Sequence, residues 1–436
     1  MKNRLMAGMI LSFVMMALGV QAQTPQKISL QDAIDMSIKN SSRLRVSDAR
    51  ILQATAAVRE ARDRQLPDVA ASASYVRLSS AKIDLKNAQP GSTNNTPKIS
   101  QALYGIVNVS MPLYAGGRIK YGIESAKYLE QAARLSAEND KEGVIFNTIQ
   151  AYTNLYKASQ AIVVIHENLS ASVQRDSTFS RLEKNGLLAR NDLLKAQLQT
   201  SNIELNLLDA ENNLAISNVN MALMLGLPEN LVIDIDTSFV MASKPMQPFA
   251  DLENLALKNR KDIQAIGFQT EAAATDIKVA KAAAFPTLAL TGGYIAADIP
   301  KFITITNAVN VGIGLQYNLA SLWKTNTKLQ QARSKESELL ATSQMLNDAT
   351  RLQVNKDFQD YLHQQKKIEV YQKAVAQASE NFRITKNKYD NSLVTITELL
   401  DADVSLLQAQ LNAAVAKADA ALAYNKLLLT TGNLSK

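Results

Sequence analysis

The sequence of 436 residues contains no cysteine, only two histidines and a single tryptophan. Without cysteine there is no disulfide framework, no thiolate metal site and no attachment point for an N-terminal lipid. His166 and His363 do not form a His-x-x-x-His or His-Glu-x-x-His spacing. No nucleophile-elbow, Walker-type or dinucleotide-binding pattern occurs. We therefore expect no catalytic residue, no bound metal and no cofactor, and an enzyme is not predicted.

Residues that interrupt helices are missing from two long stretches. No proline occurs between Pro112 and Pro228, and residues 315–431 contain neither glycine nor proline. Such stretches favour long helices. A helix over residues 119–182 would be about 96 Å long at ~1.5 Å per residue. An element of that length is not the core of a compact enzyme.

The first residues and the charge restrict the location of the protein. Lys2 and Arg4, an apolar run over 6–20 and the small Ala22 form the pattern of a secretory signal peptide, predicted as residues 1–22. The 47 basic and 40 acidic residues are scattered, without a basic stripe. Nucleic acid is therefore not an expected partner. No later segment is predicted to be a transmembrane helix, so a membrane-embedded part would consist of strands.

The chain carries an internal duplication. Residues recur 219 positions later in the first part of each copy and 206 positions later in the second part. The matched residues are Lys39-Asn40 with Lys258-Asn259, Pro67 with Pro286, Tyr75 with Tyr294, Asn185 with Asn391, Leu193-Leu194 with Leu399-Leu400, and Gly226 with Gly432. We predict a first structural repeat over 23–228, a linker over 229–250 and a second repeat over 251–436. The first copy has a longer loop at 79–100.

Each copy begins with one predicted helix and two strands. The helices are expected over 30–64 and 251–284, each followed by a proline. Apolar and polar residues then alternate with period two, which is typical of strands with one apolar face. The expected apolar positions are Val69, Ala71, Ala73, Tyr75, Val107, Val109, Met111 and Leu113, then Leu288, Leu290, Tyr294, Val311, Ile313, Leu315, Tyr317 and Leu319.

Each copy ends in a predicted helical hairpin. Apolar and small residues recur at spacings of three and four after Asp192 and again after Glu398, which is the pattern of a coiled-coil seam. The chain is expected to reverse at Asn185-Gly186-Leu187-Leu188, where glycine can take the left-handed conformation. The second reversal is expected at Asp390-Asn391-Ser392-Leu393, with Asn391 in that role. Asp192 and Glu398 then lie in the first turns of the return helices, at the positive end of the dipole.

Four strands per chain cannot close a barrel. In lipid, each unpaired backbone group at a strand edge costs several kcal/mol. A barrel of about eight strands is filled by its own side chains, whereas a lumen for cargo needs more. Three chains of four strands would supply about twelve. The strand count therefore favours a homotrimer.

Three fragments together resemble the TolC-type outer-membrane efflux family. MPLYAGGR at 111–118 is similar to the family's exit from strand to helix. NGLLARNDLLKAQ from Asn185 and NSLVTITELLDADVSLLQAQ from Asn391 resemble its two periplasmic tips. The second copy departs at Ala320-Ser321-Leu322-Trp323, where two glycines are expected. The resemblance covers nearly the whole mature chain.

The resemblance implies a mainly α-helical fold with transmembrane β-strands. Duplicated helical hairpins would form an α-helical barrel, and four strands per chain would contribute to a trimeric 12-stranded β-barrel. The implied function is the exit duct of a tripartite efflux or type I secretion system in the outer membrane, with a long periplasmic extension. The implied partners are a periplasmic adaptor and an inner-membrane transporter.

The resemblance also assigns residues to a periplasmic gate. Glu398 and Asp401 would ring the aperture in three copies, and Asp192 and Tyr389 match positions that hold the family's tips closed. Val394 stands where the best-known family member has a tethering arginine. Like charges close together raise each other's pKa and attract cations. In the alternative interpretation, Glu398 is only a helix-start acid and Asp401 an exposed surface residue.

The two reversals are candidates for contact with the adaptor, because apolar groups at an exposed end often mark a partner site. The candidate residues are Gly186, Leu187, Leu188, Ala189, Ser392, Leu393, Val394 and Thr395. In the alternative interpretation, their apolar side chains merely cap each turn. A second function also stays open, a periplasmic coiled-coil adaptor of an export complex. Two matched hairpins, each preceded by alternating strands, favour the channel.

Overall fold

The computed structural model describes residues 26–79, 99–237, 248–300, 302–322 and 326–434. The expected signal peptide and most of the loop 79–100 lie outside these residues. The chain forms two compact units: Met1–Val46, Glu138–Lys261 and Asn347–Lys436 make up unit 1, and Ser47–Ala137 and Asp262–Leu346 make up unit 2. Each unit draws on both halves of the chain, so the predicted repeats are divisions of the sequence, and their boundaries stay a prediction.

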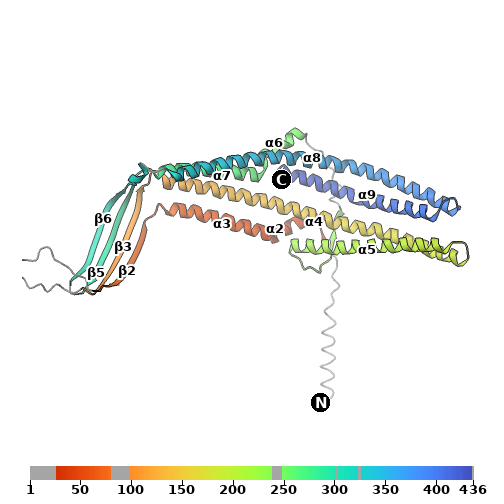
Figure 1. Cartoon of the computed structure of the whole chain (residues 1–436), viewed down its shortest axis with the longest axis horizontal. Helices are drawn as coiled ribbons and strands as arrows, with labels where there is room; N and C mark the ends of the chain where they lie inside the picture. Colours follow the sequence, from red (N-terminus) through yellow and green to blue (C-terminus); the bar gives the residue numbers. More distant parts are fainter. Residues whose placement is uncertain (1–25, 80–98, 238–247, 301, 323–325, 435–436) are drawn as a thin grey trace, which may run out of the picture. The chain divides into compact units, whose positions relative to one another are not determined.

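Helices and strands follow one another in the same order twice (Figure 1). The first series is α2 (Leu30–Asn40), α3 (Ser42–Asp63), β2 (Asp68–Arg77), β3 (Gln101–Tyr114), α4 (Arg118–Lys184) and α5 (Arg190–Leu225). The second series is α6 (Phe249–Asn259), α7 (Lys261–Ala282), β5 (Thr287–Ile299), β6 (Ile303–Gln316), α8 (Thr327–Asp390) and α9 (Ile396–Thr430). The short strands β1 (Gln26–Ile28) and β4 (Ile233–Ile235) and the 3-10 helix η2 (Leu319–Leu322) complete the described elements.

Unit 2 contains an antiparallel sheet in the order β2-β3-β5-β6. Its register aligns residues of one kind across the strands: Ala71, Val107, Tyr294 and Val309 stand opposite one another in one row. The next row along the strands contains Asn108, Gly293 and Asn310. Since side chains of neighbouring positions point to opposite faces, these rows confirm the predicted alternation.

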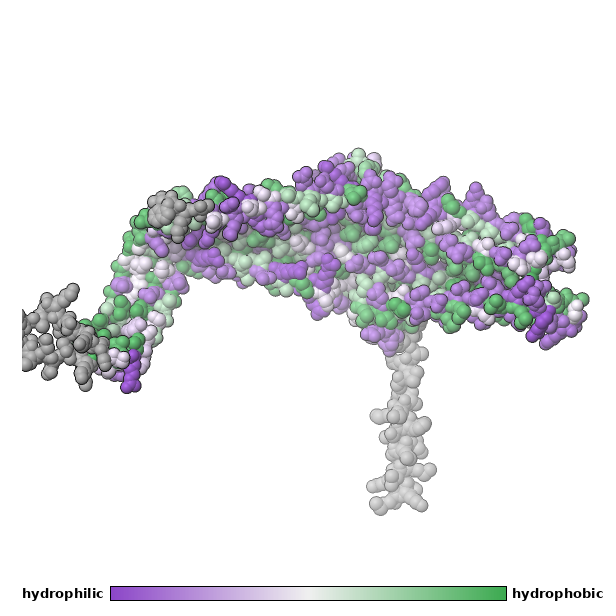
Figure 2. All heavy atoms as spheres, viewed as in Figure 1, coloured by the Kyte–Doolittle hydropathy of each residue, from purple (hydrophilic) through white to green (hydrophobic). Residues whose placement is uncertain are grey.

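One face of the sheet exposes a regular series of aliphatic side chains. On β6, every second residue is largely exposed, from 69% to 79%, at Val309, Val311, Ile313 and Leu315. Figure 2 shows hydrophobic residues over the strands and mostly hydrophilic ones over the long helices. Within the described residues, β2 and β6 each pair with a single neighbour. The sheet therefore ends in two open edges.

Unit 1 contains two related cores beneath the hairpins. In the first, α2, α4 and α5 bury Ala33, Leu155 and Leu225 together. In the second, α6, α8 and α9 bury Leu252, Val354 and Leu427 in the corresponding way. Both cores are built from one short helix and the two helices of a hairpin. The two copies thus use different side chains for the corresponding contacts between helices.

Matching glycines end the return helices of both copies. Gly226 and Gly432 have φ of +70° and +67°, in the left-handed region that favours glycine. A Cβ at Gly226 would lie 2.8 Å from the side chain of Asn40, and one at Gly432 would lie 2.9 Å from the backbone of Asn259. Asn40 Nδ2 also donates to the carbonyl of Leu225 at 2.6 Å. The recurring Lys-Asn pair is therefore part of a repeated tertiary contact.

The prediction of one continuous helix at the start of each copy was wrong. Ser41 separates α2 from α3 with ψ of 117°, and Arg260 separates α6 from α7 with ψ of 126°. These ψ values are extended and cannot continue a helix. Each break follows the asparagine that contacts the terminal glycine region. The local sequence has no proline there, so nothing in the helical pattern marked the break.

The predicted position of the fourth strand was also wrong at both ends. We expected its apolar series to run from Val311 to Leu319, but β6 covers Ile303–Gln316. Tyr317 lies outside the strand, and Leu319 begins η2. The last pair of the β5–β6 ladder is Thr287 with Gln316. The apolar alternation of the sequence continues beyond Gln316, into residues that have no pairing partner on β5.

Tyr152 joins the short parallel strands to α4. Its side chain is fully buried, its hydroxyl donates to the carbonyl of Ile28 at 2.9 Å, and it accepts from the N–H of Asp236 at 2.8 Å. Burial raises the pKa of Tyr152 to about 12. The protonated hydroxyl is therefore the form that stabilises the fold.

Tyr152→Phe should lower the free energy of unfolding by about 1–3 kcal/mol, since it leaves buried backbone groups unpaired. Because the folded pKa lies above the ordinary value near 10, the stabilisation is present below about pH 10 and is lost as the pH rises toward 12. Thermal unfolding followed by circular dichroism in detergent should show this difference at pH 7 and a smaller one above pH 10.

Tyr128→Phe is the control, because it also removes a tyrosine hydroxyl and keeps the ring that stacks on Phe268, with 6.2 Å between the ring centroids. A Tyr152→Phe protein as stable as the control at pH 7 would contradict the assigned role of the hydroxyl.

Candidate functional site at the hairpin tips

The two hairpins reverse with the same backbone geometry. The N–H of Leu187 donates to the carbonyl of Leu182 at 2.8 Å, and the N–H of Leu393 donates to the carbonyl of Lys388 at 2.8 Å. Gly186 has φ of +74° at the first turn. Leu187 and Leu393 are each 73% exposed. The duplication therefore presents one exposed leucine at the end of each hairpin.

The second reversal uses a different residue from the one we expected. Ser392, with φ of +61°, takes the left-handed conformation that was predicted for Asn391. Ser392 is the residue 206 positions after Gly186. The side chain of Asn391 instead donates to the carbonyl of Asn387 at 2.7 Å. The duplication offset located this position better than residue preference did.

The remaining tip residues support the turns. Leu188 is half-buried and packs against a tip core to which both hairpins contribute. Ala189 is the N-cap of α5 without a side-chain hydrogen bond, whereas Thr395 caps α9 and accepts from the N–H of Glu398. Val394 is half-buried. Among the larger apolar side chains of the tips, only those of Leu187 and Leu393 are highly exposed. Leu188 instead packs inward, as the turn-capping interpretation expects.

The tip core joins the two hairpins. Phe179 of α4 and Leu193 of α5 are buried with Ile396 and Leu399 of α9. The ring of Tyr389 lies 5.7 Å from that of Phe179. Aromatic and aliphatic contacts therefore hold the ends of the hairpins together within one chain.

Tyr389 packs against this core, and Asp192 lies near enough to act on it electrostatically. Burial raises the pKa of Tyr389, and the negative charges of Asp192 and Asp390 raise it further. Within the described residues, no hydrogen bond joins the Tyr389 hydroxyl to Asp192. The Asp192 carboxylate is instead 3.4 Å from the ammonium of Lys195. The two residues are neighbours, and their interaction is electrostatic.

Glu398 and Asp401 are exposed on one side of α9, one turn apart. The carboxylate of Glu398 accepts from the hydroxyl and the N–H of Thr395, at 3.2 and 3.3 Å, in a capping box. Glu398 therefore has the helix-start role of the alternative interpretation. Its exposure leaves room for a second role.

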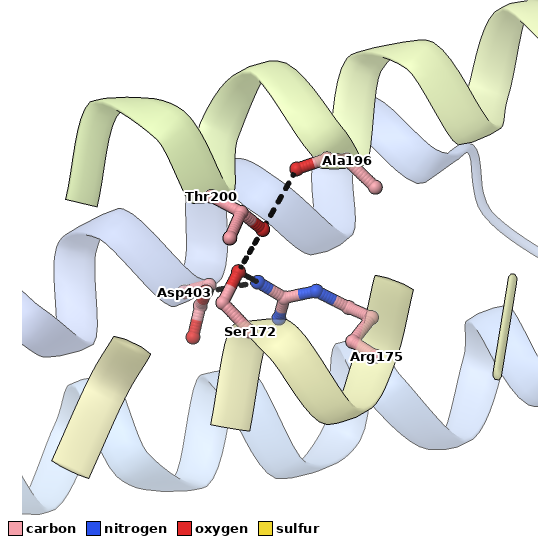
Figure 3. A network of polar contacts seen from close by, with 5 residues as sticks. All are labelled: Ser172, Arg175, Ala196, Thr200 and Asp403. Carbon is pink, nitrogen blue, oxygen red and sulfur yellow. Dashed lines mark hydrogen bonds and ion pairs between the residues drawn. The ribbon is translucent and has the colours of Figure 1, made fainter. Parts of the chain in front are cut away.

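A buried polar network below the tips was not predicted (Figure 3). Arg175 of α4 is 2.8 Å from the carboxylate of Asp403 of α9 and donates to Ser172 at 2.9 Å. The hydroxyl of Ser172 is 2.7 Å from that of Thr200 on α5. The side chains of Arg175 and Asp403 are only 12% and 6% exposed. The signal available in the sequence was an acidic residue, Asp403, directly beside an apolar position of the α9 seam, Val404.

The described residues contain no group of three or more His, Asp or Glu side chains placed to bind a metal ion. No helix in the part of the chain that the structure describes is both long and apolar enough to cross a membrane.

Comparison with known proteins agrees with this arrangement. A family model described as outer membrane efflux protein matches residues 33–227 and 252–433. The outer membrane protein TolC of Vibrio cholerae is 24% identical over 435 residues, which cover 97% of this chain and 95% of that protein. The cation efflux system protein CusC of Escherichia coli K12 is 25% identical over 348 residues, covering 72% and 69%.

Solved structures show the same fold. The outer-membrane channel OprN superposes with a TM-score of 0.77 at 20% identity, covering 93% of this chain and 90% of that one. The outer membrane protein VceC of Vibrio cholerae has a TM-score of 0.76 at 19% identity, covering 92% and 96%.

The duplicated hairpins and the four-stranded sheet thus have the fold of outer-membrane channels of known structure. The chain belongs to the outer membrane efflux protein family, whose members are channel proteins. This result favours the channel over the periplasmic adaptor.

Gly186→Ala should destabilise the first tip by about 1 kcal/mol, because φ of +74° is unfavourable for a residue with a Cβ. No atom lies within 4 Å of the added Cβ, so the effect is one of backbone conformation. Chemical denaturation in detergent would measure it.

Gly143→Ala in the middle of α4 is a matched control, since its Cβ also meets nothing within 4 Å. It should stabilise the protein by about 0.5–1 kcal/mol. Shifts of the same sign for both variants would contradict the role assigned to the left-handed turn.

Proposed function

We propose that three copies of this chain form the passive exit duct of a tripartite export system. The observation that carries the proposal is the pair of open edges on β2 and β6. Hydrogen bonding of β6 to β2 of the next copy would leave no unpaired edge, and three four-stranded sheets would close a barrel of about twelve strands. The duct carries out no covalent chemistry and needs no cofactor.

The exposed aliphatic series on β6 supports a membrane location for the sheet. A lipid-facing barrel surface requires apolar side chains at every second position of a strand. Val309, Val311, Ile313 and Leu315 satisfy this pattern, and no part of the chain that the structure describes covers them. In water the same four side chains would form an unfavourable surface.

The gate of the duct would lie at the periplasmic tips. A threefold axis brings three copies of Glu398 and of Asp401 around one opening. A ring of carboxylates attracts cations and repels anions. The capping box holds the carboxylate of Glu398 at the start of α9 in every copy, which gives the ring a defined position.

Closure of the gate would depend on Tyr389 and Asp192 together with the tip core. Val394 provides no cationic tether to a neighbouring tip. The contact of Tyr389 with Phe179, and the packing of Leu193 against Leu399, are the interactions available instead. The gate would thus be held mainly by apolar contact.

The exposed leucines of the tips would contact a periplasmic adaptor, which links the duct to an inner-membrane transporter. Leu187 and Leu393 occupy the same position in the two copies, so a ring of three chains presents six similar apolar points. An adaptor with a matching repeat could bind all of them. Selection of cargo would then lie in the transporter.

Glu398→Gln with Asp401→Asn should reduce the cation selectivity of the purified protein in planar lipid bilayers several-fold, because it removes the carboxylate ring and preserves shape. Native mass spectrometry in detergent should first show three chains. A stable monomer without conductance would refute the proposed duct.

Asp348→Asn with Glu369→Gln is the matched control, because it removes the same charge from exposed positions of α8. If the control lowered selectivity as much as the tip variant, Glu398 and Asp401 would have no special role in the gate.

Leu187→Asp with Leu393→Asp should abolish export in cells while the trimer still assembles, since buried carboxylates cannot replace apolar contacts with a partner. Export and trimer content in outer-membrane fractions would be measured together.

Asn191→Asp with Thr397→Asp adds the same charge at exposed, corresponding positions of the first turns of α5 and α9, next to the two reversals, and keeps both leucines. Export should persist in this control. Normal export by the leucine variant would show that the tips do not bind the adaptor through these side chains.

A further inference from the structure

The sequence contains a single Asn-Gly pair, and this pair lies at the first hairpin tip. Asn185 follows the last residue of α4, and Gly186 has φ of +74°. Both residues are exposed. The side-chain amide of an asparagine can be attacked by the backbone nitrogen of the next residue. Glycine favours this attack most, because it has no Cβ to hinder the approach and its backbone is the most permissive.

The side chain of Asn185 is free to approach the backbone of Gly186. Among the residues that the structure describes, no side-chain hydrogen bond holds the amide of Asn185. A Cβ added to Gly186 would meet no atom within 4 Å, so this side of the turn is open. The N–H of Gly186 donates to the carbonyl of Glu183 at 2.9 Å, and this bond must break before the nitrogen can react. An exposed turn at the end of a hairpin opens locally with a small free-energy change.

The corresponding asparagine of the second tip is held in place. Asn391 Nδ2 donates to the carbonyl of Asn387 at 2.7 Å, which directs the amide back along α8. The next residue is Ser392, whose side chain hinders an attack by its own nitrogen. Asn40, in the other Asn-Ser pair of the sequence, also donates to a backbone carbonyl, at 2.6 Å. The two tips thus share one backbone geometry and differ in reactivity.

We propose that Asn185 is a site of spontaneous covalent modification in the folded protein. The nitrogen of Gly186 bonds to Cγ of Asn185, the Cγ–Nδ2 bond breaks, and ammonia leaves with the proton that the nitrogen has lost. Water then opens the resulting succinimide ring. Opening at Cγ gives aspartate, and opening at the main-chain carbonyl gives isoaspartate, whose backbone runs through the side-chain carbons. Water is the only other reactant.

The products change the tip in two ways. Either product adds a negative charge just beyond the C-terminal end of α4, where the helix dipole disfavours it and Arg181 and Lys184 in the last turn offset it. Isoaspartate also lengthens the backbone of the turn by one atom. The hydrogen bond from the N–H of Leu187 to the carbonyl of Leu182, at 2.8 Å, spans this position. Isoaspartate would break this bond and displace Leu187, whereas Leu393 would keep its place.

The modification makes the two tips of one chain different with time. It belongs to the chain itself and does not require a trimer. Its effect on the adaptor rests on the proposed function, because Leu187 is one of the two exposed leucines assigned to that contact. In a population of channels, the first tip would change after synthesis and the second tip would not.

Peptide mapping by mass spectrometry of the purified full-length chain in detergent tests the proposal. At pH 9, the peptide with Asn185 should gain the mass difference between an amide and an acid, and an isoaspartyl methyltransferase should label it. The peptide with Asn391 should stay unchanged. Conversion should be slower at pH 7, because the nitrogen of Gly186 must lose its proton. If Asn185 stayed intact in the folded protein for as long as the denatured chain takes to convert, the proposal would be overturned.

Reciprocal variants test why the tips differ. Gly186→Ser should slow the conversion about tenfold, which is ~1.4 kcal/mol of activation free energy. The chain accepts serine in this conformation, since Ser392 has φ of +61°. Ser392→Gly should make Asn391 convert, but more slowly than Asn185, because its amide stays bonded to the carbonyl of Asn387. An unchanged rate in Gly186→Ser would overturn the succinimide route, and equal rates at the two Asn-Gly pairs would contradict the protection by that hydrogen bond.

Amide hydrogen exchange follows the effect on the turn. In aged protein, the N–H of Leu187 should exchange faster than in fresh protein, and that of Leu393 should not. Asn185→Gln is the control, because its longer side chain would have to close a larger ring, so neither tip should change with age. Unchanged exchange at Leu187 after conversion would overturn the predicted displacement. A monomer in native mass spectrometry would instead refute the duct and leave the modification standing.

Discussion

Surfaces that one chain cannot cover by itself dominate this structure. The backbone of an outer strand and the second face of a packed helix both require a partner. The chain covers such a helix face where α9 packs on α4. Among the described residues, the outer edges of β2 and β6 have no partner strand. In the proposed duct, pairing with further copies would remove the energetic cost of leaving these edges exposed.

The hairpin tips combine stability with function in the same residues. Glu398 closes the capping box of α9 and is also exposed toward the proposed opening. Tyr389 contributes its ring to the tip core and lies beside the charge of Asp192. Variants at these positions are therefore expected to change stability and, in the proposed duct, conductance. Leu187 and Leu393 differ, because they contribute exposed apolar surface and little packing.

Several parts of the fold were predictable because they depend on local patterns. The alternation in β3 and β5 and the helix-ending glycines Gly226 and Gly432 follow from short-range periodicity and backbone preference. The breaks at Ser41 and Arg260 were missed, since they depend on contacts between distant segments. The same holds for Arg175 with Asp403, whose positions are 228 residues apart. No local pattern marks such a pair.

The sequence by itself determined the duplicated order of elements, the long hairpins and the two reversal points, because periodicity and the fixed offset of 206 residues are properties of the chain alone. The tertiary structure decided which helix faces are covered, which turn residue takes the left-handed conformation and which charges are buried together. These features depend on the energy of contacts between segments far apart in the chain. Ser392 shows the difference: its left-handed conformation is unfavourable for serine, and it accompanies the hydrogen bonds that close the turn, from the N–H of Ser392 to the carbonyl of Tyr389 and from the N–H of Leu393 to that of Lys388.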